Sequence, residues 1–350
     1  KVRGSYNKMI SLGKEKLKNG VVAASAGNHA QGVAYASRML GTESTIIMPK
    51  GTPLSKVQAT KGYGAKVELH GSVFDEALDY ALELKEKNNA EFVHAFDDND
   101  IIAGQGTVGL EILEQIPDVE AIICPVGGGG LIAGIAAAVK EINPSIHIYG
   151  VEALACPSMM QSLKEMQPIT VDSTPTMADG IAVKRPGQHP FEIVQHYVDE
   201  IITVEEMEIA QTMLMLLERN KLLVEGSGAA SLATQLYQKL PIKDKKVVTV
   251  ISGGNVDVSF MSRIIERGMV EAGRFKHFNT ILKDSPGNLE KILQIVTEKK
   301  GNILDISLSH IGDKIYPSYA QLSLSVETKD RTHVNEIYDA LKQKGYKAES

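Results

Sequence analysis

Short apolar runs alternate with amphipathic stretches over the first hundred residues. Four runs read as strands: VVAAS at 21–25, STIIMP at 44–49, AKVELH at 65–70 and EFVHAF at 91–96. Between them, apolar residues recur every three or four positions, which predicts helices over 30–40, after Pro53 and over 73–88. Strands that alternate with helices form parallel sheets covered on both faces. The pattern therefore predicts an open α/β unit over about 20–100.

A second series of the same kind follows. The predicted elements are a helix near 106–114, a strand AIICPV at 121–126, a helix over 131–142, a strand HIYGVE at 147–152, a helix near 205–219, and strands KLLVEG at 221–226 and VVTVISGG at 247–254. We expect the two open α/β units to form one module, with a ligand crevice at the carboxyl ends of the strands.

The pattern changes after a predicted helix over 258–268. The remaining residues read as strand, turn, helix and strand, followed by a strand over 320–328 and a helix over 332–345. This β-α-β-β-α order is a split βαβ unit that lacks its final strand. We expect that strand to be clipped at Ser350, and we expect further residues before Lys1, because the chain does not begin with methionine.

Composition narrows the class of protein. At 350 residues the chain exceeds one ordinary core, so two or three domains are expected. Its 43 acidic and 37 basic residues form no long run of one sign, so neither nucleic acid nor a membrane surface is an expected partner. No apolar run approaches the ~20 residues of a membrane span. Cys124 and Cys156 have no CxxC companion, which favours a reducing, cytoplasmic location.

Four consecutive glycines, Gly127 to Gly130, stand between an apolar strand and an apolar helix. In that arrangement successive backbone N–H groups converge on an anion, and the helix dipole adds to the attraction. The loop has neither the GxxxxGK[ST] of a P-loop nor a spaced GxGxxG. A phosphate site is the favoured interpretation, and a tightly packed glycine turn is the alternative.

Two more loops of similar design follow strands. In SAGNHAQG, Ser25, Gly27, Asn28 and His29 stand at a helix start, where ordinary N-capping is the alternative to ligand binding. In SGGNVD, Ser252 ends a β-branched strand and could also cap a helix. One phosphorylated aromatic cofactor would use all three loops, for its phosphate, its ring and the substrate.

Six motifs in order carry a resemblance to a known family. KVRGSYNK, SAGNHAQG, VGGGGLIAG, ADGIAVKRPG, VEGSGAA and SGGNVD resemble the threonine dehydratases (threonine ammonia-lyases), which have the pyridoxal-phosphate β-elimination fold, also called fold type II or tryptophan synthase β-like. The tail, with DSPGNLEKILQIV, resembles an ACT regulatory domain. The resemblance implies an α/β catalytic domain of two parallel-sheet subdomains over 1–268 and a ferredoxin-like βαββαβ ACT-like domain over 275–350.

The resemblance also implies a set of site residues. Lys1 would hold pyridoxal 5'-phosphate as a Schiff base, the glycines would bind its phosphate, Ser252 would face the pyridine nitrogen and Asn28 the ring oxygen O3′. Ser25, Gly27, Asn28 and His29 would bind the substrate. Glu225 and the carbonyl of Gly180 would orient the cofactor and the amine. The full set implied for the cofactor is Lys1, Asn28, Gly127, Gly128, Gly129, Gly130, Gly180, Glu225 and Ser252.

The implied reaction is deamination of L-threonine to 2-oxobutanoate and ammonia, and of L-serine to pyruvate. Lys1 would act as the base that takes the Cα proton. A serine hydroxyl does not force protonation of the pyridine nitrogen as a carboxylate would, which favours elimination over long-lived carbanion chemistry.

Two other functions remain open at this point. Serine racemases share most of the motifs, but they carry a serine that protonates the opposite face where this chain has Ala26. Glu152 matches one racemase metal ligand, whereas Ser158 stands where a carboxylate is expected, so we expect no metal. A non-catalytic amino-acid sensor is the second alternative. The ACT-like tail would bind an amino-acid effector or serve only oligomer contacts, and we expect a homodimer or homotetramer. The site chemistry leaves open a biosynthetic role, in isoleucine biosynthesis, or a degradative one.

Overall fold

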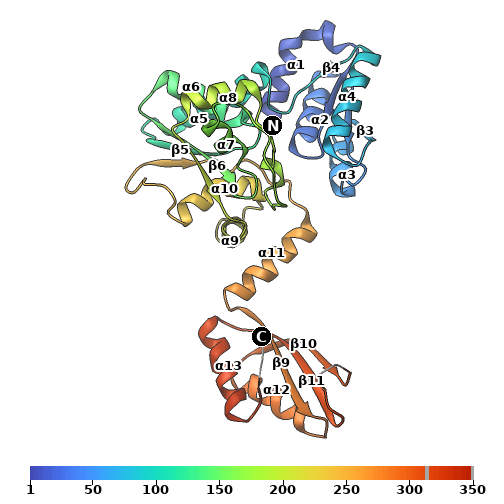
Figure 1. Ribbon diagram of the computed structural model, residues 1–350, viewed down its shortest axis with the longest axis vertical. Helices are drawn as coiled ribbons and strands as arrows, with labels where there is room; N and C mark the ends of the chain where they lie inside the picture. The colour runs from blue at the N-terminus through green and yellow to red at the C-terminus, as the bar shows by residue number, and fades with distance from the viewer. Residues whose placement is uncertain (312–314, 348–350) are drawn as a thin grey trace. The chain divides into compact units, whose positions relative to one another are not determined.

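The computed structural model describes residues 1–311 and 315–347, and it divides into two compact units, Lys1–Asp257 and Val258–Ser350 (Figure 1). The division falls before helix α11 (Val258–Glu271), which the sequence pattern groups with the first unit. Each unit has its own buried core, so each is described by itself.

The smaller sheet of the first unit consists of four parallel strands in the order β3-β2-β1-β4, drawn in blue and cyan in Figure 1. In β1, alternate residues enter two different cores: Val21 and Ala23 pack on one side of the sheet, and Val22 and Ala24 on the other. Both faces are therefore covered, as the alternating pattern predicts. The elements are α1 (Val2–Leu17), β1 (Val21–Ala24), α2 (Asn28–Leu40), β2 (Ser44–Met48), α3 (Leu54–Gly62), β3 (Lys66–Leu69), α4 (Phe74–Asn88) and β4 (Glu91–Phe92).

The larger sheet is also parallel, in the order β7-β6-β5-β8. Strand β5 is buried along its whole length, and helices α6 and α10 contact it. The elements are α5 (Asn99–Gln115), β5 (Ala121–Pro125), α6 (Gly130–Ile142), β6 (His147–Ala153), α7 (Ser158–Lys164), η1 (Asp179–Ile181), α8 (Gln188–Tyr197), β7 (Glu200–Val204), α9 (Glu206–Met215), η2 (Leu216–Asn220), α10 (Gly226–Leu236) and β8 (Val247–Thr249). The two parallel sheets agree with the predicted α/β class.

The predicted strand at 221–226 is wrong. Lys221, in the left-handed region with φ of 59°, ends the preceding helix, and the following residues are irregular until α10 begins. Leu222 N–H donates to Leu216 O and Glu225 N–H donates to Gly253 O, so the segment bonds to a helix end and to a loop rather than to a strand. An apolar run of this length does not distinguish a strand from a buried connection.

The second unit has the predicted element order. It runs β9 (Phe275–Lys283), α12 (Asn288–Glu298), β10 (Asn302–Ser309), β11 (Tyr319–Glu327) and α13 (Arg331–Gln343) after α11. The sheet is antiparallel, in the order β10-β11-β9, and its core includes Phe278, Ile292, Leu322 and Ile337. Residues 344–347 form no strand, and 348–350, where the clipped strand was expected to end, lie outside the described residues.

Within the described ranges, none of the helices has the length and apolar content needed to cross a membrane. Cys124 and Cys156 are buried free thiols.

Candidate active site

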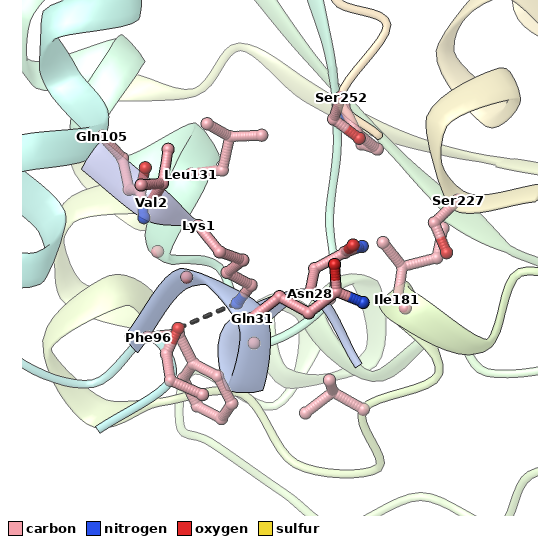
Figure 2. Close-up of a pocket in the computed structure, with 18 of the residues that line it drawn as sticks. Lys1, Val2, Asn28, Gln31, Phe96, Gln105, Leu131, Ile181, Ser227 and Ser252 are labelled. Carbon is pink, nitrogen blue, oxygen red and sulfur yellow. Dashed lines mark hydrogen bonds between the residues drawn. The ribbon is translucent and has the colours of Figure 1, made fainter. Parts of the chain in front are cut away.

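The three loops singled out in the sequence meet around one cavity of about 530 Å³ in the first unit (Figure 2). They follow β1, β5 and β8, so the cavity lies at the carboxyl ends of parallel strands, as expected for open α/β sheets. Its lining comprises Lys1, Val2, Asn28, Gln31, Gly32, Tyr35, Tyr63, Ala95, Phe96, Gln105, Pro125, Gly127, Gly128, Gly129, Gly130, Leu131, Gly180, Ile181, Val183, Glu225, Ser227 and Ser252.

Lys1 lies in the cavity wall directly before helix α1. Its Nζ donates a hydrogen bond of 2.8 Å to the carbonyl oxygen of Ala95 and stands 5.9 Å from the centroid of the Phe96 ring (Figure 2). Burial lowers the pKa of the Lys1 ammonium to about 8, although the charge of Glu225 opposes this shift. The amine is therefore partly neutral near physiological pH, as a nucleophile or base must be.

Helix α2 holds the start of the chain in place. A Cβ on Gly32 would lie 3.2 Å from the carbonyl carbon of Lys1 and 3.3 Å from its Cβ. The glycine thus lets the backbone of Lys1 approach α2 closely.

The loop Gly127–Gly130 packs tightly against protein as well as lining the cavity. A Cβ on Gly128 would lie 2.4 Å from the Phe96 ring, and a Cβ on Gly129 would lie 2.6 Å from Cε of Met159. Gly129 also has a φ of 95°, in the left-handed region that favours glycine. The loop is therefore tightly packed, which was the alternative to a phosphate site. It also lines the cavity, so the two interpretations are compatible.

The N-terminus of helix α6 opens on the same cavity, because Gly130 and Leu131 both line it. The first N–H groups of a helix have no partner within the helix, and the dipole of its peptide units favours an anion there. A phosphate group is the kind of ligand that this end of the cavity suits.

Asn28 and Glu225 link two of the loops. Asn28 Nδ2 donates to Glu225 Oε1 at 2.6 Å, across 197 positions of the chain. Glu225 is 4% exposed, and burial raises the pKa of its carboxyl. A Cβ on Gly253 would lie 2.3 Å from Glu225 Oε1, so this carboxylate also contacts the loop that carries Ser252. Glu225 therefore positions Asn28 against the loop after β8.

Three of the predicted substrate-binding residues do not line the cavity. Ser25 Oγ accepts a hydrogen bond from Gly27 N–H at 3.2 Å, within its own loop. The His29 ring is 3% exposed, and its Nε2 lies 2.8 Å from the carbonyl oxygen of Val93. Burial lowers the pKa of His29 to about 3, which keeps the imidazole neutral. The His29 side chain is thus turned to the protein interior, and substrate binding by these three residues stays a prediction.

The cavity is also lined by the remaining predicted site residues and by residues that were not predicted. Ser252, Gly180 and Glu225 line it, as do Phe96 and Ser227, which no sequence motif singled out for a role. Ser227 lies within the motif VEGSGAA. Its position in this glycine-rich helix start is the one sequence feature that could have identified it as a site residue.

Glu152 and Ser158, which were compared with metal ligands, are bonded within the protein. The carboxylate of Glu152 accepts from the N–H groups of Met159 at 2.8 Å and Met160 at 2.9 Å. Ser158 Oγ donates to Val183 O at 2.6 Å. Over residues 1–311 and 315–347, no group of three or more His, Cys, Asp or Glu side chains is arranged to hold a metal ion.

The donor set suits pyridoxal phosphate. An amine on Lys1, a helix N-terminus formed by glycines, the Asn28 amide and the Ser252 hydroxyl all line one cavity. Ser227 Oγ adds a buried hydroxyl with no hydrogen-bond partner among the described residues. A ligand with an aldehyde, a phosphate and a polar aromatic edge would use each of these groups.

Comparison with known proteins agrees with this chemistry. The family profile described as "Pyridoxal-phosphate dependent enzyme" matches residues 1–253. The chain is 49% identical over 346 residues to a Thermotoga maritima protein named L-threonine ammonia-lyase, covering 99% of this chain and 86% of that one.

Two solved structures also resemble the chain. The processed form of threonine deaminase isoform 2 from Solanum lycopersicum matches with a TM-score of 0.72 and 40% identity, covering 76% of this chain and 78% of that one. Maize serine racemase matches with a TM-score of 0.72 and 35% identity, covering 77% and 84%. The protein belongs to the family of pyridoxal-phosphate dependent enzymes.

Proposed function

We propose that the protein is an L-threonine ammonia-lyase, which converts L-threonine to 2-oxobutanoate and ammonia and also accepts L-serine, giving pyruvate. The observation that carries this proposal is the amine of Lys1, with a pKa of about 8, in one cavity with the glycine loop at the start of α6. The 49% identity to a protein of that name over nearly the whole chain supports it.

The residues of the cavity divide the work of holding the cofactor. Lys1 would hold it covalently, Gly127–Gly130 would bind the phosphate, Ser252 would face the pyridine nitrogen and Asn28 the ring oxygen. When bound, pyridoxal phosphate supplies an electron sink for the electron pair that remains at the substrate Cα after the proton leaves.

Lys1 is the group of the chain that moves the proton. When the amine of the substrate replaces Lys1 on the cofactor, the Lys1 amine becomes free. In its neutral form it takes the Cα proton of the bound amino acid, and Nζ then carries that proton as an ammonium. The C–O bond to the β-hydroxyl breaks, the hydroxyl leaves with a proton as water, and hydrolysis of the resulting enamine releases ammonia and the 2-oxo acid. The Ala95 carbonyl, 2.8 Å from Nζ, keeps the amine on one side of the cavity.

Ser252 favours elimination. A neutral hydroxyl exerts less pull on a pyridine nitrogen than a carboxylate would, so negative charge at Cα is less stabilised and the β-leaving group departs early. This agrees with an enzyme that expels water rather than one that maintains a carbanion.

Contacts from helix α3 would help to keep water out of the cavity. Lys56 Nζ lies 2.7 Å from Asp179 Oδ2 in η1, whose next residues, Gly180 and Ile181, line the cavity. Ser55 Oγ donates to Asp257 Oδ2 at 3.1 Å, beyond the loop of Ser252. These two contacts join the smaller subdomain to loops of the larger one.

The test is an absorbance spectrum of the purified protein, followed by L-threonine with 2-oxobutanoate and ammonia measured. A visible cofactor band together with keto-acid formation supports the proposal. A protein with neither would contradict the proposal and favour the alternative of a non-catalytic amino-acid sensor.

Serine racemisation is the competing activity, because maize serine racemase has the same TM-score as the threonine deaminase. Racemisation needs an acid on the face of Cα opposite the lysine, and Ala26 offers no proton where racemases carry a serine. We expect pyruvate from L-serine and little D-serine. A chiral assay that finds D-serine as the main product would reverse this order.

We also propose an ACT-like regulatory role for the second unit, within a cytoplasmic homodimer or homotetramer that supplies 2-oxobutanoate for isoleucine synthesis. Its β-α-β-β-α order supports the comparison. Activity measured with and without isoleucine or valine, together with the mass of the assembly in solution, tests this role. A unit that serves subunit contacts alone would leave the kinetics unchanged.

A further inference from the structure

Ser227 carries a buried hydroxyl that the mechanism above does not use. It is the second residue of helix α10, is 2% exposed, and its Oγ has no hydrogen-bond partner among the described residues. Ser227 nevertheless lines the cavity, on the side where Asn28 and Ile181 lie (Figure 2). A buried hydroxyl without a partner is costly, and at a position in the cavity lining a bound ligand can supply that partner.

Gly180 shows which part of the cavity wall Ser227 belongs to. A Cβ on Gly180 would lie 2.8 Å from Ser227 Oγ and 3.8 Å from Asn28 Nδ2. The hydroxyl and the amide thus flank one small part of the cavity wall. Asn28 Nδ2 has two N–H groups and donates one of them to Glu225, which leaves a second for a ligand.

The charges around Ser227 argue against an anionic ligand group at this point. Glu225, two residues earlier in the chain, is a buried acid, and Asp179, which pairs with Lys56, precedes Gly180. A phosphate or a substrate carboxylate here would meet like charge, whereas the glycine loop at the start of α6 offers N–H groups instead. A hydroxyl, which can both donate and accept, suits a polar group of low charge.

We propose that Ser227 Oγ hydrogen-bonds to the polar edge of the pyridine ring of bound pyridoxal phosphate, next to the Asn28 amide. The inference rests on the cofactor of the family and is independent of which amino acid is the substrate. It adds a ring-binding residue from helix α10 to those of the three loops.

Ser231 provides a matched control. It lies one turn further along α10, is 0% exposed, and its Oγ also has no hydrogen-bond partner within the described part of the chain. Ser231 is absent from the cavity lining. Both serines therefore share burial, helix and missing partner, and they differ in access to the cavity.

The experiment compares the wild type with Ser227→Ala and Ser231→Ala, without substrate. Apoprotein is titrated with pyridoxal phosphate, the visible absorption band is recorded from pH 6 to 10, and apoprotein melting is measured. Ser227→Ala should weaken cofactor binding about three- to tenfold, the loss expected for one hydrogen bond, and shift the band or its pH midpoint. Its apoprotein should melt no lower than the wild type, because alanine favours the helix and removes an unpaired hydroxyl.

Ser231→Ala should leave the affinity and the band unchanged. The proposal fails if Ser227→Ala has wild-type affinity and spectrum, or if both variants change them equally. Should Ser227→Ala not fold, Ser227→Cys keeps the side-chain size with a weaker donor, and an unchanged spectrum in that variant also overturns the proposal. A wild-type protein that binds pyridoxal phosphate but forms no keto acid from L-threonine would count against the proposed reaction and not against this contact.

Discussion

The two units of the chain use opposite kinds of sheet. In Lys1–Asp257 both sheets are parallel, and strands such as β1 and β5 are buried along their whole length. In the second unit the sheet is antiparallel, and β11 alternates buried with more exposed residues. Parallel strands place all their carboxyl ends at one edge, so the loops after β1, β5 and β8 converge. Antiparallel strands send successive ends to opposite edges, and their loops do not converge in this way.

The difference extends to the cavities. The hollow of the second unit runs along α12, and its charged lining residues are Glu290 and Glu298. The cavity of the first unit contains Lys1 beside the glycine loop and a buried carboxylate, Glu225. The cavity with the candidate amine and phosphate site therefore lies in the unit of parallel sheets. We expect cofactor binding to survive a mutation in the antiparallel core.

The largest effect should come from Lys1→Ala. Removal of the amine takes away both the covalent attachment of the cofactor and the base, so kcat should fall by at least about 10²–10⁴-fold. Assays of 2-oxobutanoate and the absorbance spectrum measure the two losses. Lys14→Ala, at an exposed position of α1, is the control. Full activity in Lys1→Ala would remove the lysine from the reaction.

Leu322→Ala should destabilise the second unit without altering the site. Leu322 is 0% exposed in the core of the antiparallel sheet, and truncation of such a side chain costs about 2–5 kcal/mol of unfolding free energy. A calorimetric scan should show an earlier transition while the cofactor band keeps its position. If the cofactor band also changes in this variant, the core of the second unit affects the cofactor site, and the two units are not independent.

Gly128→Ala should damage the glycine loop. The new methyl group would lie 2.4 Å from the Phe96 ring, and overpacking of this kind costs about 1–3 kcal/mol. Since the loop cannot keep its place, cofactor affinity measured by titration should fall. Gly51→Ala is the control, because a Cβ there meets nothing within 4 Å. Equal affinities in the two variants would contradict the close packing of this loop.

Activity should rise with pH up to about 8. The base form of Lys1 is the neutral amine, and burial sets the pKa of its ammonium at about 8. Below that value kcat should fall about tenfold for each pH unit, because kcat reports the substrate complex, in which the Lys1 amine is free and its neutral fraction falls in that proportion. A rate profile from pH 6 to 9 measures the midpoint. A rate that does not change between pH 6 and 9 would show that titration of the Lys1 ammonium does not limit the reaction.

The smallest effect should come from Lys56→Ala. The side chain of Asp179 is 57% exposed, and ion pairs of this kind contribute about 0.2–1 kcal/mol. We expect KM to rise a few-fold or less. We also expect KM to depend less on salt concentration in this variant than in the wild type. Lys66→Ala breaks a pair with Glu68 inside the smaller subdomain and should leave KM unchanged. Identical KM values in both variants would mean that α3 does not help to close the cavity.

The sequence by itself determined the α/β class of the first unit and predicted which loops share a cavity. Alternating apolar periods predicted both parallel sheets and the β-α-β-β-α order of the second unit, because side-chain periodicity is a local property of helices and strands. The three loops after strands predicted where a ligand would lie, since parallel strands share one edge. Lys1, Asn28, the glycines and Ser252 all line the cavity.

Only the tertiary structure decided which side chains reach the cavity. The loop sequence of His29 resembles a binding motif, yet its ring bonds to Val93 because the smaller core buries it. Ser227 enters the cavity wall, and the segment 221–225 remains irregular, although the sequence of neither indicates this. Such outcomes depend on contacts between residues as far apart as Asn28 and Glu225, and no local period encodes a contact across 197 positions.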